Sequence, residues 1–261
     1  MRTPIALSIA GSDPSGGAGL QADLKTFHEF GVYGEAVVTL ITVQNTHGIR
    51  RLEALAPELV MEQLRAVIQD IPPAAAKTGA LGSAALADAI AAEAQHFAFP
   101  LVVDPVMFSK NGAQLADLDP LSFAALIRAA YLITPNLHEA SILSGFPVDD
   151  LDSMRRAAEK LTELGAANVL VKGGHLEGDA VDVLYTPGHG FREFPGVRVN
   201  TVHTHGTGCT YSAAITAELA KGTALEPAIE RAKQFISHAI QTNPDLGGGS
   251  GPLNFHGPRR A

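Results

Sequence analysis

The residues best suited to chemistry lie in a glycine-rich segment near the C-terminal end, THGTGCT at positions 204–210. Glycines let the backbone approach a ligand closely, and the first N–H groups of a helix have no partner within it. If a helix starts here, these N–H groups and the positive end of the helix dipole meet at one point. The segment therefore favours an anion site, although a short glycine motif alone is also typical of an ordinary helix start.

Cys209, the one cysteine of the chain, falls in the first turn of that expected helix. The helix field favours a thiolate and lowers a thiol pKa from its usual value of about 8.5, so Cys209 is a candidate base. A single cysteine is also commonly a small buried core residue. His205 lies four residues earlier, but a glycine turn does not bring the two side chains into a catalytic pair.

A second segment, AGSDPSGGAG at 10–19, lies between an expected strand and an expected helix. It has neither the G-x-G-x-x-G order of dinucleotide sites nor the G-x-x-x-x-G-K-[ST] order of phosphate loops. In the helix that follows, Leu20, Leu24 and Phe27 form an apolar stripe, and Asp23 falls on the same stripe. An inward carboxylate needs a partner, which is either a ligand or a nearby backbone or lysine donor.

A third candidate is Gln44, within TVQNT at 42–46 at the end of an expected strand. Its amide offers a donor and an acceptor side by side. The edge of an aminopyrimidine displays the complementary pair. A Gln-Asn pair after a strand is also ordinary turn chemistry.

The fourth set comprises Asp104, Glu139 and Lys172, each just after an expected buried strand. Two carboxylates can hold Mg²⁺ through its waters, and a lysine beside glycines can neutralise nucleotide phosphates. For each residue alone, an ordinary surface salt bridge or a helix cap is the favoured interpretation. Three such positions at equivalent strand ends favour a phosphoryl-transfer site.

The elements that must position these residues alternate between short β-branched runs and longer helical patterns, which is typical of βα units and a mostly parallel sheet. The expected strands are Ile5–Ile9, Ala36–Val43, Ala75–Thr78, Leu101–Val106, Tyr131–Thr134, Val169–Lys172 and Val181–Tyr185. The expected helices are Gly19–Phe30, Glu58–Ile71, Ala84–Ala94, Leu121–Ala129, Leu137–Leu143, Ser153–Leu164, Gly208–Lys221 and Glu226–Thr242. Ligands of such sheets bind beyond the carboxyl ends of the strands, where we expect the site.

Composition bounds the class of protein. The 261 residues are 46% hydrophobic and 18% charged, which predicts one globular domain over 1–261. A formal net charge of −8 argues against nucleic acid or anionic membrane as a partner and favours small molecules. The N-terminal residues are unlike a signal peptide, and a single cysteine excludes an internal disulfide, so we expect a cytoplasmic protein. GGGSG at 247–251 predicts a flexible terminus.

Taken together, these segments resemble the bacterial hydroxymethylpyrimidine/phosphomethylpyrimidine kinases of thiamine biosynthesis. The resemblance runs from the first strand to the tail. It is carried by AGSDPSGGAGLQADLKTF at 10–27, GVYG at 31–34, QNT at 44–46, AAKTGAL at 75–81, VVDPVM at 102–107, TPN at 134–136 with Glu139, VLVKGGH at 169–175 and THGTGCT at 204–210.

The resemblance implies a ribokinase-like three-layer α/β/α sandwich with a mostly parallel central sheet and no separate lid domain, assembled as a homodimer. It also implies transfer from ATP, with Mg²⁺, to 4-amino-5-hydroxymethyl-2-methylpyrimidine and then to the monophosphate. Most of the superfamily has Asp at the last position of the glycine loop, where this chain and the pyrimidine kinase branch have Cys209.

Residue roles follow by resemblance. Cys209 would assist deprotonation of the acceptor, helped by the backbone amides of Gly206, Thr207 and Gly208 and by Lys172. The pyrimidine would contact Gln44, Asp23, Gly11 and Ala18; the nucleotide would contact Lys172, Asn136 and Gly208; and Asp104 and Glu139 would hold the metal. The chain departs from the usual family pattern at His203 and at FSKNG, 108–112.

Three alternatives remain. The nearest is a pyridoxine or pyridoxal kinase, which shares the fold and the glycine-cysteine loop; Gln44 favours the pyrimidine because pyridoxine lacks the amino donor. A cysteine hydrolase using Cys209 would need neither ATP nor Mg²⁺. A non-catalytic nucleotide-binding regulator would turn over no acceptor.

Overall fold

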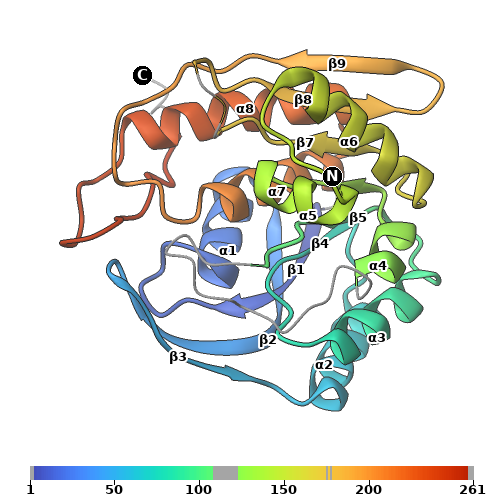
Figure 1. Ribbon diagram of the computed structural model, residues 1–261. Coiled ribbons are helices and arrows are strands. Elements are labelled where there is room, and N and C mark those ends of the chain that lie inside the picture. The colour runs from blue at the N-terminus through green and yellow to red at the C-terminus, as the bar shows by residue number, and fades with distance from the viewer. Residues whose placement is uncertain (1–2, 108–122, 175, 177, 258–261) are drawn as a thin grey trace.

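The computed structural model describes residues 3–107, 123–174, 176 and 178–257, and these form one nine-stranded sheet in the order β3-β2-β1-β4-β5-β6-β7-β8-β9 (Figure 1). The segment 108–112 and His175 lie outside the described residues. The strands are β1 (Ile5–Ser12), β2 (Tyr33–Asn45), β3 (Gly48–Ala54), β4 (Ala75–Thr78), β5 (Leu101–Val103), β6 (Leu132–Ile133), β7 (Val169–Val171), β8 (Asp182–Thr186) and β9 (Gly190–Phe194).

The middle of the sheet is parallel, as the sequence predicts. The pairs β2–β1, β1–β4, β4–β5, β5–β6 and β6–β7 are parallel, and hairpins at the two edges add β3, β8 and β9 in antiparallel pairing. Parallel neighbours need crossover connections, and helices supply most of them here. Helices therefore cover the sheet.

The helices form two outer layers (Figure 1). Leu7, Ile9 and Val103 point to the face covered by α2 (Pro57–Asp70), α3 (Ala84–Ala94), α4 (Ala124–Ala129), α5 (Leu137–Ser144) and α6 (Leu151–Glu163). Ala6 and Val102 point to the other face, against α1 (Gly19–Glu29), α7 (Thr207–Ala220) and α8 (Leu225–Gln241). Alternate strand residues thus enter separate cores, which is why the central strands are mostly apolar on both faces, with the buried polar residues Ser8 and Lys77 among the exceptions.

The sheet reverses its strand order at β1. From β1 the chain passes to β2 on one side, and β4 later pairs with the other side of β1. Crossovers that leave in opposite directions open a crevice beyond the carboxyl end of β1. The loop at 12–19 therefore lies where a ligand of this fold is expected.

Two strands, β3 and β9, are not predicted from the sequence. β3 carries Arg50, Arg51 and Glu53 and is largely exposed, so it lacks apolar alternation. It pairs with an extended β2, which places Gln44 inside a strand rather than after one. β9 is likewise an exposed edge strand. All eight predicted helices are confirmed within a few residues among the described positions.

The tail 247–251 differs from the flexible terminus expected from its glycines. Ser250 N–H donates to Thr46 O over 2.8 Å, and His205 N–H donates to Gly251 O over 3.1 Å. A Cβ on Gly249 would lie 2.2 Å from Thr46 O, so the glycines permit close contact between the tail and the β2–β3 hairpin. The described residues form neither a separate lid domain nor any helix with the length and apolarity that a bilayer crossing requires.

Candidate active site

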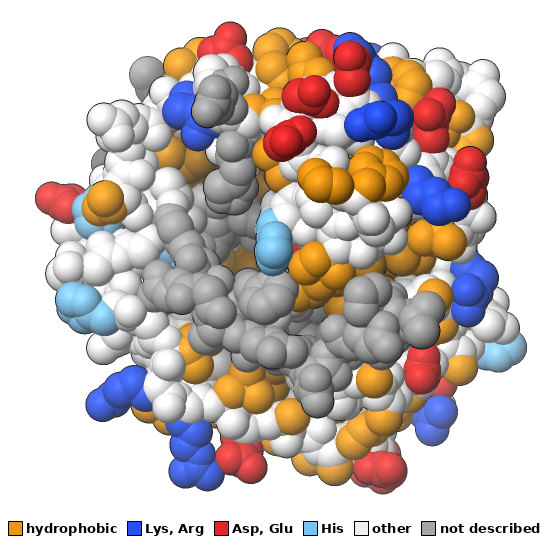
Figure 2. Space-filling view, in the orientation of Figure 1, with side chains coloured by type: hydrophobic (Ala, Val, Ile, Leu, Met, Phe, Trp, Pro, Cys, Tyr) orange, Lys and Arg blue, Asp and Glu red, His pale blue; other side chains and the backbone are white. Residues whose placement is uncertain are grey.

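A cavity of about 1100 Å³ lies beyond the carboxyl ends of the strands. Its walls include every residue that the sequence put forward except Asp23: Gly11, Ala18, Gln44, Asp104, Asn136, Glu139, Lys172, Gly206, Thr207, Gly208 and Cys209. Figure 2 shows the molecule hollowed near the middle of one face, with charged side chains around the periphery. Segments far apart in the chain thus contribute to one chamber, as the contact between Asp13 and His205, which are 192 residues apart, illustrates.

The glycine loop starts α7 and presents a positive end to the cavity. Gly206 is the N-cap with a left-handed φ of 81°, and a Cβ there would lie 1.8 Å from Gly17 O. Thr207 N–H is already bonded to Thr204 O, whereas the N–H groups of Gly208 and Cys209 have no backbone acceptor among the described residues. An anion bound at this helix start would therefore contact the N–H groups of Gly208 and Cys209 rather than that of Thr207.

Lys172 and Asp104 lie over this helix start. Lys172 Nζ donates to Asp104 Oδ1 over 2.8 Å, and Thr134 and Ser212 hydroxyls also donate to Asp104. A Cβ on Gly208 would be 3.4 Å from Lys172 Nζ and 3.8 Å from Asp104 Oδ2. Although burial opposes the charged form, the Lys172 and Lys77 ammonium groups hold the pKa of Asp104 below its usual value.

Glu139 and Asn136 form a capping box at the start of α5. Asn136 Oδ1 accepts from Glu139 N–H, and Glu139 Oε2 accepts from Asn136 N–H over 2.8 Å. Burial raises the pKa of Glu139 to about 7, against the opposing charge of Lys172. One carboxylate oxygen of Glu139 stays outside the cap and can face a ligand.

The donors on this wall suit Mg²⁺ bound partly through water and phosphate. Asp104 and Glu139 are close enough for the charge of one to raise the pKa of the other. The described residues contain no group of three or more His, Cys, Asp or Glu side chains that would enclose a metal. Mg²⁺ keeps several waters and is usually bound by one or two carboxylates with substrate phosphates, so this pair fits it.

The expected low pKa of Cys209 is wrong. Burial raises the pKa of the thiol to about 11, and the nearby charge of Lys77 only partly opposes this. Removing the thiolate from water outweighs the helix field at this position. At neutral pH Cys209 is therefore a protonated thiol at the mouth of the anion site. His205 faces Asp13 and Gln44, so the geometry favours no cysteine hydrolase.

Asp23 lies away from the cavity wall, in a fully buried ion pair. Lys77 Nζ, on β4, is 2.9 Å from both carboxylate oxygens, and Ser8 Oγ donates to Oδ2 over 2.5 Å. Both charged side chains are wholly inaccessible. The structure thus gives Asp23 a protein partner, the lysine alternative that its place on the apolar stripe left open.

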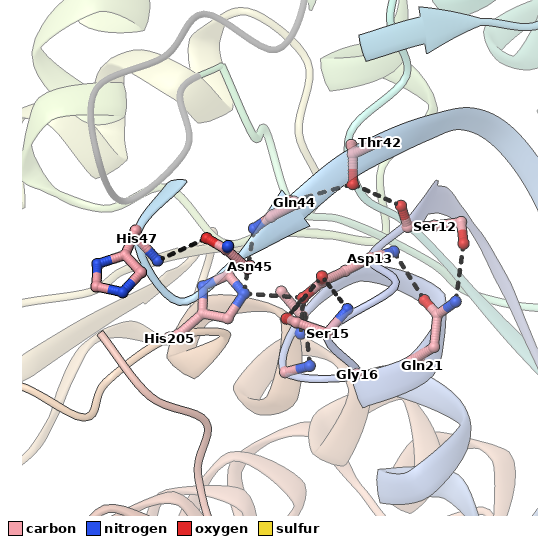
Figure 3. A network of polar contacts seen from close by, with 12 residues as sticks. Ser12, Asp13, Ser15, Gly16, Gln21, Thr42, Gln44, Asn45, His47 and His205 are labelled. Carbon is pink, nitrogen blue, oxygen red and sulfur yellow. Dashed lines mark hydrogen bonds and ion pairs between the residues drawn. The ribbon is translucent and has the colours of Figure 1, made fainter. Parts of the chain in front are cut away.

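A polar network missed by sequence reasoning surrounds Gln44 (Figure 3). Asp13 accepts from Ser15 and from the N–H groups of Gly17 and Ala18. Its Oδ2 also lies 2.8 Å from His205 Nε2, which in turn is 3.2 Å from the Gln44 amide. The Asp-Pro-Ser order at 13–15 is a turn signal, but it does not reveal the contact with His205.

His203, a departure from the usual family pattern, holds the tail. Gly251 N–H donates to His203 Nδ1 over 3.1 Å, and His203 Nε2 lies 2.7 Å from Asp245 Oδ1. Because Nδ1 accepts, the ring carries its proton on Nε2 toward Asp245. The side chain has a structural task outside the wall formed by Asp104 and Lys172.

Comparisons with known proteins agree on one family. The family model described as phosphomethylpyrimidine kinase matches residues 13–254. The hydroxymethylpyrimidine/phosphomethylpyrimidine kinase of Bacillus subtilis is 41% identical, over 98% of this chain and 96% of that protein. The thiamine biosynthesis bifunctional protein of Geobacter sulfurreducens is 48% identical over 95% of this chain, which spans about half (51%) of that longer protein.

Two solved structures are similar throughout. The pyridoxal kinase of Bacillus subtilis in complex with ADP has a TM-score of 0.88 and 38% identity, covering 97% of this chain and 98% of that one. The phosphomethylpyrimidine kinase of Clostridium difficile has a TM-score of 0.80 and 41% identity, covering 90% of this chain and 99% of that one.

Proposed function

The chain belongs to the phosphomethylpyrimidine kinase family and is a kinase, and from this premise we propose the reaction that its cavity performs. ATP phosphorylates 4-amino-5-hydroxymethyl-2-methylpyrimidine, and a second transfer converts the monophosphate to the diphosphate. The observation that carries this proposal is that the walls of one cavity hold both the Gln44 amide, for the pyrimidine, and the start of α7 with Lys172, for the phosphates. Acceptor and phosphate donor can therefore meet in one chamber.

The acceptor end is the part lined by Gln44, Gly11 and Ala18. The Gln44 amide would pair with the aminopyrimidine edge, while the backbone around Gly11 leaves room for the flat ring. A Cβ on Gly11 would lie 2.5 Å from the Leu40 side chain, so a glycine is needed for Leu40 to pack directly against the backbone here. The hydroxymethyl group would then point toward Cys209.

The phosphate end is the start of α7 with Lys172. Phosphoryl transfer has a loose transition state, so the protein contributes mainly positioning and charge stabilisation. The Gly208 and Cys209 N–H groups and the Lys172 ammonium would bind the transferring phosphoryl group, and Asn136 would contact the nucleotide. Bound Mg²⁺ would neutralise the phosphate chain; Asp104 and Glu139 would hold it together with water.

Cys209 would act as a hydrogen-bond partner for the acceptor oxygen rather than as a resident thiolate. Its raised pKa leaves it protonated at neutral pH. In a loose transition state the acceptor hydroxyl loses its proton late, so orientation matters more than a strong base.

The proposed assembly is a homodimer in the cytoplasm. Light scattering that gives only the 27.2 kDa mass of one chain would contradict the dimer.

Product analysis tests the reaction. The protein is incubated with ATP, Mg²⁺ and hydroxymethylpyrimidine, with pyridoxal in a parallel tube, and products are identified by mass spectrometry. We expect the monophosphate and then the diphosphate of the pyrimidine, both greatly reduced in Cys209→Ala.

The second candidate is pyridoxal kinase activity, favoured by the similarity to the ADP-bound pyridoxal kinase. Efficient phosphorylation of pyridoxal alone would reassign the substrate and keep the transfer chemistry. ATP turnover without any phosphorylated acceptor would support a regulator instead, and hydrolysis without ATP would support a hydrolase.

A further inference from the structure

Asp13 and His205, from two loops that are distant in the sequence, contact each other, and His205 also contacts the Gln44 amide (Figure 3). We propose that Asp13 and His205 are positioning residues that fix the orientation of the Gln44 amide and so set which acceptor edge the cavity recognises. This inference rests on the proposed contact between Gln44 and the pyrimidine. His205 contacts the Gln44 amide and Asp13 contacts His205, and neither residue is assigned to the reacting atoms.

The first step is the proton between Asp13 and His205. The Asp13 carboxylate accepts from Ser15 N–H and Oγ–H and from the N–H groups of Gly17 and Ala18 at 2.7–3.2 Å. Although burial alone raises its pKa, the bonds from His205 and Ser15 lower it below the usual value. A carboxylate ringed by donors is ionised, so His205 Nε2 carries a proton and donates it over 2.8 Å.

The second step is the Gln44 amide. With its nitrogen 3.2 Å from His205 Nε2, two donors would face each other. Its oxygen would then need the Thr42 hydroxyl proton, which Ser12 O also accepts over 3.0 Å. Turning the amide by a half rotation removes both conflicts. The oxygen then shares the single His205 Nε2–H with Asp13 Oδ2, at the longer distance of 3.2 Å, and the nitrogen donates to Thr42 Oγ1. The two ends of an amide have nearly the same shape, so hydrogen bonds decide its orientation.

The consequence for recognition is a fixed polarity. Once His205 and Thr42 hold the amide, Gln44 keeps one oxygen lone pair and one N–H for a ligand, in a set order. An aminopyrimidine offers a ring nitrogen beside an amino group and can match that order. A freely rotating amide would match either order of donor and acceptor. It would lose rotational freedom when the ligand binds, and it would discriminate less between acceptors.

The same pair fastens the loop 12–19 to the glycine loop. A Cβ on Gly17 would lie 2.6 Å from His205 Cδ2, and a Cβ on Gly206 would lie 1.8 Å from Gly17 O. The tail fixes His205 from the other side, since His205 N–H donates to Gly251 O. His205 is thus held by backbone contacts that do not depend on Gln44, as a positioning residue requires.

Kinetics with three variants test the proposal. His205→Phe should raise the KM for the pyrimidine about tenfold, leave the KM for ATP within about twofold, and lower the pyrimidine-to-pyridoxal ratio of kcat/KM about tenfold. His205→Gln places an amide nitrogen near the Nε2 position and should restore the wild-type values to within about threefold. His189→Gln, in the exposed turn before β9, is the matched control. An unchanged acceptor KM and ratio in His205→Phe would overturn the proposal, as would equal rises in both KM values.

Nuclear magnetic resonance gives a second test that needs no activity measurement. With ¹⁵N-labelled histidine and glutamine, His205 Nε2 should carry a proton, and the Gln44 amide signals should shift when Asp13→Asn is introduced. An unprotonated His205 Nε2 in the wild type would overturn the inference. If Gln44→Ala leaves the pyrimidine KM unchanged, the proposed contact between Gln44 and the substrate has failed. The resonance experiment then still decides the orientation of the Gln44 amide.

Discussion

At the scale of single residues, the chemistry of Cys209 depends on its surroundings rather than on its position in the chain. A helix N-terminus lowers a thiol pKa, but burial raises it, and here burial dominates. A raised thiol pKa means that the folded protein holds the proton more tightly than the unfolded chain. The thiolate form therefore appears only as the pH approaches about 11.

Alkylation measures this directly, because Cys209 is the one cysteine of the chain. The rate of reaction with iodoacetamide should be low at pH 7–8 and should rise about tenfold per pH unit until the pKa is reached. Unfolding in urea should bring the rate constant to that of an ordinary thiol. Rapid alkylation at pH 7, levelling off near pH 8, would show a low-pKa thiolate and return Cys209 to the role of base.

At the scale of elements, a buried ion pair ties α1 to the centre of the sheet. Lys77 on β4 and Asp23 on α1 are both fully inaccessible, and Ser8 on β1 supports the carboxylate. Removing one partner leaves an unpaired buried charge, whereas removing both with apolar residues of similar size is often neutral. The pair fixes the helix that follows the loop 12–19.

The single variant Lys77→Met should lower the free energy of unfolding by about 3–5 kcal/mol. The double variant Asp23→Leu/Lys77→Met should recover most of that loss, as measured by urea denaturation at pH 7. The double variant also tests the role in substrate binding that the resemblance implied for Asp23. A stable double variant with a greatly raised pyrimidine KM would restore that role.

β2 carries a buried carboxylate, Glu35, at the opposite end of the strand from Gln44. Neither of its oxygens has a hydrogen-bond partner among the described residues. Burial, aided by the charge of Asp70, raises its pKa to about 7. Because the folded-state pKa lies above the unfolded one, ionisation destabilises the fold progressively between about pH 4.5 and pH 7 and fully above that range.

Glu35→Gln removes this charge. We expect its melting temperature to exceed that of the wild type by about 2–4 °C at pH 8, which corresponds to roughly 1 kcal/mol for a domain of this size after solvent screening. At pH 4.5 the difference should vanish, because Glu35 is then protonated. Scanning calorimetry at the two pH values checks this, and an equal gain at both would point to packing instead of charge.

At the scale of the whole molecule, the cavity is assembled from both halves of the chain. Loops after β1, β5, β6 and β7 and the start of α7 meet at one edge of the sheet. A ligand that touches all of them should stabilise the folded state by mass action, by about 2.7 kcal/mol at one hundred times its Kd. Nucleotide binding is therefore visible as a thermal shift.

Lys172→Met should weaken that shift for a non-hydrolysable ATP analogue with Mg²⁺, raising the apparent Kd at least about tenfold, because the phosphates lose a charged partner. Hydroxymethylpyrimidine binding should change little. Each variant is compared with its own unliganded melting temperature, and Lys160→Met, on the exposed side of α6, is the control. An ATP shift equal to that of the wild type would remove Lys172 from the nucleotide site.

The sequence by itself determined the alternation of strands and helices, the parallel centre of the sheet and the edge where the site lies. These follow from local periodicity and from the crossover rule, which act over tens of residues. It also singled out the glycine loop, Asp104, Glu139 and Lys172, because each lies near the end of a buried strand or the start of a helix.

Only the tertiary structure decided the partners of polar side chains. From the sequence, the partner of Asp23 was either a ligand or a donor of the protein; in the structure it is Lys77, 54 residues away. His205 acquired its proposed role from Asp13, 192 residues away, and the high pKa of Cys209 comes from its removal from water in the folded chain. Hydrogen bonding and desolvation depend on which atoms meet in space, and local sequence carries little information about contacts across such separations.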